Sequence, residues 1–88
     1  MVRKKLIAGN WKMNKLVTEA TDYGDAFLEA LKKENVDPGK VDIVIFAPYI
    51  HIAALNVIFM LRDIKTGAQN MHFEDKGAFT GEISPSML

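Results

Sequence analysis

The sequence predicts an α/β fold in which parallel strands alternate with helices. Short, mainly apolar segments that suit buried strands occupy residues 5–9, 41–47 and 64–68. Two segments with helical character, residues 18–33 and 51–61, lie in the gaps between them. Because a connection between parallel strands usually contains a helix, the order β-α-β-α-β indicates a parallel sheet.

The three strands are recognised by their composition and by the residues that end them. Residues 5–9 are short, mainly apolar and end at Gly9. Residues 41–47, VDIVIFA, are β-branched and almost continuously apolar, and Pro48 ends them. Such runs are typical of strands that are buried on both faces. Residues 64–68, IKTGA, give a weaker third strand.

The first helix, residues 18–33, shows one apolar stripe. Its small or apolar residues recur close to every 3.6 positions, at Ala20, Gly24, Phe27, Leu28 and Leu31. Thr18 is the predicted N-cap, and Glu19 and Asp22 suit the positive end of the helix dipole. The cluster NVDPGK, residues 35–40, predicts a turn after the helix.

The second helix, residues 51–61, has almost no polar face. Apolar residues fill it except for His51 and Asn56. A helix that is apolar all round is expected to be buried on more than one side. A larger body, a partner chain or aggregation would supply the cover.

Residues 69–84, QNMHFEDKGAFTGEIS, form a long polar loop without clear periodicity. Loops between strand and helix usually have about 2–6 residues, so the length indicates a functional role. Ser84 and Pro85 then look like the N-cap and first residue of a third helix. Because only four residues follow Ser84, we expect a truncated chain.

Composition excludes several classes of protein. The 88 residues suit one small domain, and 11 basic residues balance 11 acidic ones, which argues against nucleic acid as a partner. With no cysteine, neither a disulfide nor a cysteine zinc site is expected, and a cytoplasmic location fits. The longest apolar run, residues 52–61, is broken by Asn56 and falls short of the roughly 20 residues that span a membrane.

The stretch AGNWKMN carries the first candidate site. Asn10 and Lys12 directly follow the first strand, and ligands of parallel α/β folds bind at the carboxyl ends of the strands. A lysine there could meet a phosphate or a developing oxyanion. The alternative is a solvated surface lysine. Trp11 and Met13 are interpreted as packing residues on either side of the polar pair.

The other polar candidates favour structural roles. His51 and His72 lack carboxylate-rich metal spacing, and a surface or capping role is expected for each; no metal site is predicted. Glu74 and Asp75 are expected to be solvated. Gly77 and Gly81 indicate either two turns or a loop that presents the residues between them to a partner.

Two motifs, AGNWKMN and GAQNMHFEDKGAFTGEIS, resemble triosephosphate isomerase, and SPSML continues the resemblance. The resemblance covers essentially the whole chain. It implies that residues 1–88 are an N-terminal fragment of one TIM-barrel domain, about the first third of a (β/α)8 barrel that needs about 250 residues.

The resemblance also implies a reaction and its residues. It implies interconversion of dihydroxyacetone phosphate and glyceraldehyde 3-phosphate through an enediolate, in glycolysis and gluconeogenesis, without a cofactor. Asn10 and Lys12 match substrate-binding residues, and Lys12 also matches a catalytic one. The family is a homodimer in which the long loop enters the neighbouring subunit, which makes the following residues subunit-interface residues: Phe79, Thr80, Gly81 and Glu82.

Nothing in these 88 residues matches the family's base, electrophilic histidine, lid or phosphate-binding glycines. We therefore expect the chain alone to be inactive. One alternative is a non-catalytic fragment that self-associates or complements a missing part of the barrel, because open sheet edges invite pairing. Another is a small flavodoxin-like phosphate binder, which would not explain the long loop.

Overall fold

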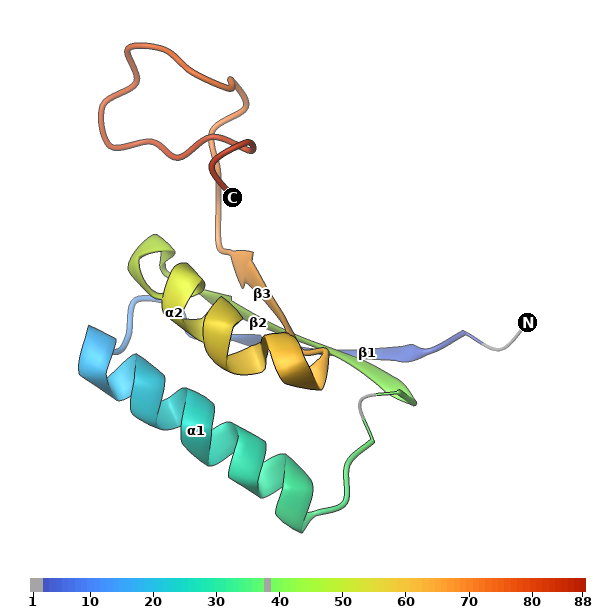
Figure 1. The fold of residues 1–88 in the computed structure, drawn as a ribbon. Helices are drawn as coiled ribbons and strands as arrows, with labels where there is room; N and C mark the ends of the chain where they lie inside the picture. The colour runs from blue at the N-terminus through green and yellow to red at the C-terminus, as the bar shows by residue number, and fades with distance from the viewer. Residues whose placement is uncertain (1–2, 38) are drawn as a thin grey trace.

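The computed structural model describes residues 3–37 and 39–88 and contains the predicted order β-α-β-α-β (Figure 1). The strands form one parallel sheet in the order β1-β2-β3. Their bounds and those of the helices are β1 Lys5–Asn10, α1 Val17–Lys33, β2 Val41–Ala47, α2 Tyr49–Phe59 and β3 Lys65–Ala68, with one 3-10 turn at Met60–Arg62. The fold class predicted from the sequence is confirmed.

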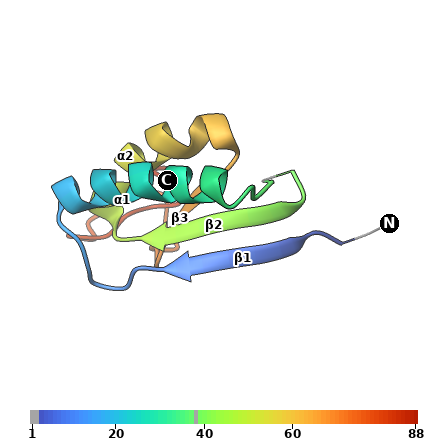
Figure 2. The ribbon, with the colours of Figure 1, turned by 90° about the horizontal axis from the view of Figure 1, so that it is seen from below.

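Both helices cover the same face of the sheet (Figure 2). Alternate residues of β2, which are Ile43, Ile45 and Ala47, are buried on that face. They belong to a core whose other members are Trp11, Ala20, Leu55, Phe59 and Ile64. Burial of this kind supplies the main stabilisation of a small domain.

The two helices approach each other at Gly24 of α1. A Cβ atom placed there would lie 3.0 Å from Cδ1 of Ile58 and 3.4 Å from Cδ2 of Leu55, both in α2. Glycine therefore permits the close contact of α1 with α2, because any larger side chain would push Ile58 aside.

The opposite face of the sheet is open among the described residues. Val44 and Phe46 lie on it, since side chains alternate along a strand. The Phe46 ring lies over Gly67 of β3, where a Cβ atom would come within 2.6 Å of the ring. At the β1 edge, Leu6 is 63% exposed and Ile7 is 58% exposed. A residue on each face of β1 is therefore uncovered.

Helix starts differ from the prediction. The N-cap of α1 is Leu16, not Thr18. The Glu19 carboxylate accepts a hydrogen bond from the Leu16 backbone N–H at 2.9 Å, so it satisfies a donor at the helix start without a hydroxyl cap. Helix α2 begins at Tyr49, directly after Pro48, whose carbonyl accepts the His51 N–H at 3.0 Å.

Within the part of the chain that the structure describes, α2 is buried on one side only, which leaves the cover expected on its other sides to a larger body or a partner chain. The buried residues of α2 are His51, Leu55 and Phe59, one stripe with a spacing of four. Ile50 and Val57 are each 69% exposed. The apolar character of α2 thus exceeds what α1 and the sheet can cover.

Residues 69–88 project from the sheet as a loop (Figure 1). The third helix predicted at Ser84 is present only as a turn over residues 85–87. The Ser84 Oγ accepts the Met87 N–H at 3.3 Å, as an N-cap would, and the Ser84 carbonyl accepts the same N–H at 3.2 Å. The capping chemistry of Ser84 is therefore in place without a helix.

Candidate functional site

The candidate site lies where β1 and β3 end. Asn10 is the last residue of β1 and pairs in register with Phe46 of β2, so its side chain is on the open face. Gln69 directly follows β3, and its neighbour Ala68 pairs with the helix-side Ala47, so Gln69 also falls on the open face. The parallel register therefore brings two amides together from positions 59 residues apart.

A network of three hydrogen bonds joins these residues to Lys12. The Asn10 Oδ1 accepts the Lys12 backbone N–H at 2.9 Å and a Gln69 Nε2–H at 3.1 Å. The same Gln69 amide donates to the Lys12 carbonyl at 2.9 Å. Because a backbone N–H can only donate, the Asn10 oxygen faces inward, and its Nδ2 donor is left to face a ligand.

Lys12 carries the charge of this site. It is exposed, and its ammonium forms no ion pair with the described residues. Its backbone φ of 57° is in the left-handed region, which is uncommon for a residue other than glycine. At 4 Å and an effective dielectric constant of 20, the ammonium would attract a unit negative charge by about 4 kcal/mol. The arrangement can bind an anion.

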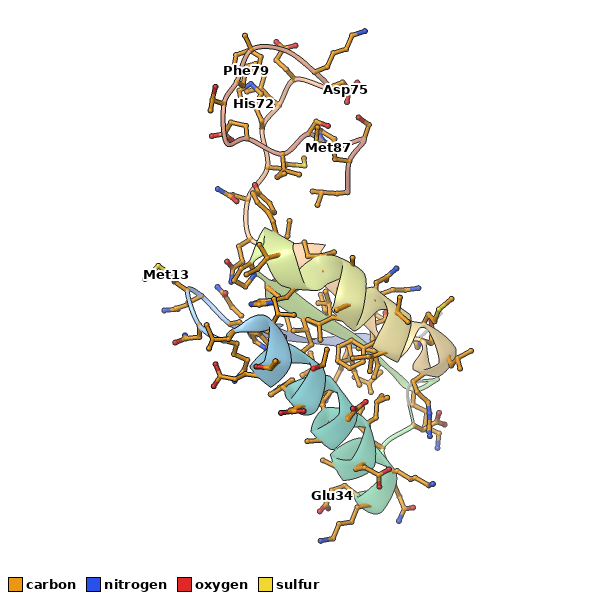
Figure 3. The ribbon with its side chains drawn as sticks, turned by 60° about the vertical axis from the view of Figure 1, so that its left-hand side comes forward. Met13, Glu34, His72, Asp75, Phe79 and Met87 are labelled. Atoms are coloured by element: carbon orange, nitrogen blue, oxygen red, sulfur yellow. The ribbon has the colours of Figure 1, made fainter. Side chains whose placement is uncertain are left out.

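The two neighbours of Lys12 differ in burial. Trp11 is 8% exposed and meets the Tyr23 ring edge-on at 5.0 Å, so its predicted packing role is confirmed. Met13 is 94% exposed and lies at the outer tip of the segment in Figure 3. The packing role predicted for Met13 is wrong within the described chain.

The predicted interface residues lie at the far end of the loop from the sheet (Figure 3). The Glu82 N–H donates to the Phe79 carbonyl at 3.1 Å and closes a tight turn with Thr80 and Gly81 at its tip. Gly81 has φ 84°, the value that the third residue of a type II turn requires. All four residues are exposed, Phe79 by 45%.

The Phe79 ring fixes the inner side of the loop. It lies 4.2 Å from the His72 ring, and the His72 N–H donates to the Ile83 carbonyl at 2.8 Å. At Gly77, which has φ 149°, a Cβ atom would be 2.6 Å from the Phe79 ring. The Phe79 ring therefore packs within the loop, while Thr80 and Gly81 lie exposed in the turn that follows it.

A comparison with protein families completes this description. The family model described as triosephosphate isomerase matches residues 5–88. The chain belongs to the triosephosphate isomerase family. Asn10, Lys12 and the loop of residues 69–84 all fall inside the matched range.

The fold is that expected for part of the barrel of triosephosphate isomerase, and it corrects the interpretation of His51. His51 is 1% exposed, not a surface residue, and its Nε2 lies 2.8 Å from the Lys15 carbonyl oxygen. His72 is half-buried between the rings of Phe73 and Phe79. Neither imidazole forms a hydrogen bond with Asn10 or Lys12.

Gln69 is the site residue that sequence reasoning missed. The sequence places it in the long loop, although two signals mark it: its position directly after β3, and its place in the GAQN part of the triosephosphate isomerase motif. Over residues 3–37 and 39–88, no group of three metal-ligating side chains is found. No helix in the same ranges is long and apolar enough to cross a membrane.

Proposed function

We propose that this chain supplies the Asn10–Lys12 part of a triosephosphate isomerase active site. The reaction is the interconversion of dihydroxyacetone phosphate and glyceraldehyde 3-phosphate, without a metal or organic cofactor. The observation that carries the proposal is the Asn10–Lys12–Gln69 network at the carboxyl ends of the strands, with the Lys12 ammonium exposed. A cytoplasmic role in glycolysis and gluconeogenesis follows from this reaction.

Charge explains why this reaction needs a residue such as Lys12. A base removes the proton next to the carbonyl, and the carbonyl oxygen becomes the oxyanion of an enediolate. The substrate also carries a phosphate. An ammonium beside both groups stabilises the transition state more than the neutral carbonyl of the ground state, and removing one such group typically costs about 10²–10³ in rate.

The 88 residues alone are expected to lack isomerase activity. The hydrogen bonds of Asn10 and Lys12 within the described residues go to each other and to Gln69, and none reaches a carboxylate or an imidazole. Lys12 can therefore bind and stabilise charge, but no base adjoins it. Base-dependent conversion of glyceraldehyde 3-phosphate by the purified chain, abolished by Lys12→Ala, would contradict this expectation.

The binding half of the proposal is tested with glycerol 3-phosphate, which has the phosphate of the substrate but no carbonyl. We expect titration to shift the amide NMR signals of Asn10, Lys12 and Gln69. Lys12→Ala removes the shifts, while Lys5→Ala, at the opposite end of β1, retains them as a matched loss of one lysine. Equal shifts in both variants would show binding by general charge only.

We also propose that residues 79–82 contact a second copy of the chain in a homodimer. Beside the candidate site, an open, mainly apolar groove of about 300 Å³ is lined by Met13, Leu16, Pro48 and Ile50, among others. It offers apolar surface to the partner's Phe79, and it borders the segment that holds Lys12. Substituting Phe79→Asp is expected to weaken association measured by sedimentation.

A second candidate function is non-catalytic association through the sheet. With the order β1-β2-β3, both outer strands are edges in the described chain, and Leu6 and Ile7 are exposed on β1. Unpaired strand edges template pairing with other chains. Size-exclusion chromatography with light scattering distinguishes the two modes: a Phe79-independent assembly that Ile7→Lys disperses would favour edge pairing.

A further inference from the structure

The segment that holds Lys12 carries backbone strain at two positions. Lys12 has φ 57° and Lys15 has φ 78°, and neither is a glycine or an asparagine. A residue held in such a sparsely populated region costs about 1–3 kcal/mol and persists only where its surroundings determine it. The segment therefore needs anchors outside itself.

Two anchors come from β2 and α2. Before Lys12, the Trp11 N–H donates to the Phe46 carbonyl of β2 at 2.9 Å. After Lys12, the Lys15 carbonyl lies 2.8 Å from Nε2 of His51 in α2. Lys12 thus lies between two hydrogen-bonded residues, Trp11 and Lys15. Their partners, Phe46 and His51, are only five positions apart in the sequence.

The His51 ring is buried and packed where it can make this contact. It is 1% exposed, and its centroid lies 5.8 Å from that of Trp11. Because a carbonyl oxygen only accepts, Nε2 must carry the ring proton. Nδ1 has no hydrogen-bond partner among the described residues, so the ring's one hydrogen bond is the one to Lys15.

The Lys15 side chain adds a second link. Its ammonium lies 5.4 Å from the Trp11 ring centroid and 5.2 Å from that of Tyr23, within range of a cation–π interaction. The Lys15 carbonyl contacts His51, and the Lys15 ammonium lies against the rings of Trp11 and Tyr23, so both the backbone and the side chain of Lys15 are held. These contacts accompany the left-handed φ of Lys15.

We propose that His51 is a positioning residue for Lys12, which it holds in place through the Lys15 carbonyl. The inference rests on the proposed function only for the importance of Lys12. Loss of the His51 bond would release the strain at Lys15 and let residues 12–15 relax, and this would move the Lys12 N–H away from Asn10.

Two substitutions of His51 by amide side chains, glutamine and asparagine, separate the effect of the hydrogen bond from that of packing. A glutamine Nε2–H can reach the position of the imidazole Nε2, whereas the shorter asparagine amide corresponds to Nδ1 and does not reach Lys15. We expect His51→Asn to raise hydrogen exchange of the Lys12 amide about five- to tenfold, the ratio for one lost hydrogen bond, and His51→Gln to stay within about twofold.

The control is a loss of core packing away from the segment. Leu28→Ala removes a partly buried side chain that packs against the core from α1. It is expected to speed exchange of the Ile45 amide in β2 without a selective effect at Lys12. Equal Lys12 exchange in the wild type and in His51→Asn would overturn the proposal, as would acceleration by Leu28→Ala that matches that of His51→Asn.

One measurement needs no variant and so cannot fail through misfolding. Long-range ¹⁵N–¹H NMR of the wild-type imidazole is expected to place a proton on Nε2 of His51. A proton on Nδ1 alone would overturn the proposal, because Nε2 could then not donate to the Lys15 carbonyl. These outcomes do not depend on glycerol 3-phosphate binding. If the proposed function failed its own test, the NMR and exchange results for His51 could still be interpreted.

Discussion

The body of residues 5–68 and the loop of residues 69–88 differ in what fixes their conformation. The body is held by a core to which β2 and both helices contribute, together with Trp11 after β1 and Ile64 before β3. In the loop, the conformation is held by the ring contact between His72 and Phe79, the hydrogen bond from His72 to Ile83, and two turns, one at residues 79–82 and one at residues 84–88. Much of the loop is solvent-exposed, including Phe73 at 82%.

Among the described residues, few hydrogen bonds link the two regions. The Tyr49 hydroxyl donates to the Asn70 carbonyl at 2.7 Å, and Gln69 joins the candidate site. Regions that share few buried contacts open independently of each other. We therefore expect substitutions in the body to change global stability, and substitutions in the loop to change local order alone.

The largest effect is expected from Phe59→Ala. Phe59 is fully buried in α2 and meets the Phe27 ring at 6.0 Å, and such truncations cost about 3–5 kcal/mol in the free energy of unfolding. That is a large part of the stability of a domain this small. Urea unfolding followed by the fluorescence of Trp11, the only tryptophan, measures it.

Leu61→Ala is the control for Phe59→Ala. Leu61 is 89% exposed, so its loss is expected to change the free energy of unfolding by less than about 0.5 kcal/mol. Similar urea midpoints for the two variants would mean that the buried stripe of α2 contributes little to the stability of the body.

A smaller loss is expected from Gly24→Val at the contact of α1 with α2. The added side chain would meet Ile58, and overpacking of this kind costs about 1–3 kcal/mol, reduced by a few tenths because valine is a better helix former than glycine. Adding Ile58→Ala makes room and should recover part of the loss. A double variant less stable than either single one would contradict the close approach.

The sequence predicted the body better than the loop for a physical reason. Burial leaves a pattern: the almost continuous apolar run of residues 41–47 and the small or apolar stripe of residues 18–33, including Gly24, can be read without coordinates. The start of α1 could not be read, because a Glu19 carboxylate replaced the hydroxyl cap that Thr18 suggested. Tertiary context decided between two local solutions.

For the candidate site, the sequence identified Asn10 and Lys12 but not what surrounds them. Gln69 reaches Asn10 only through the register of three strands, and His51 reaches Lys15 only through the packing of α2. Such contacts join residues far apart in the chain, and no local pattern records them. The family motif located residues 79–82 without giving the conformation of the loop.

In the loop, the larger effect is expected from Gly77→Ala. Its φ of 149° is unfavourable for alanine, and the new methyl group would collide with the Phe79 ring. Hydrogen exchange of the His72 amide should rise by about tenfold or more, since about 1–3 kcal/mol of strain opposes the folded loop. The urea midpoint of the body should not change; a clear decrease would show that the two regions are coupled.

The smallest effect is expected at Gly81, where conformation alone is at stake. No atom lies within 4 Å of a Cβ atom placed there, but φ is 84°. Alanine in the left-handed region costs about 1 kcal/mol, whereas asparagine tolerates that region better. Exchange of the Glu82 amide, which is bonded to Phe79, should therefore rise about fivefold in Gly81→Ala and less in Gly81→Asn. Equal exchange in the two variants would mean that the turn relaxes to another conformation and that the left-handed φ of Gly81 does not hold the loop in place.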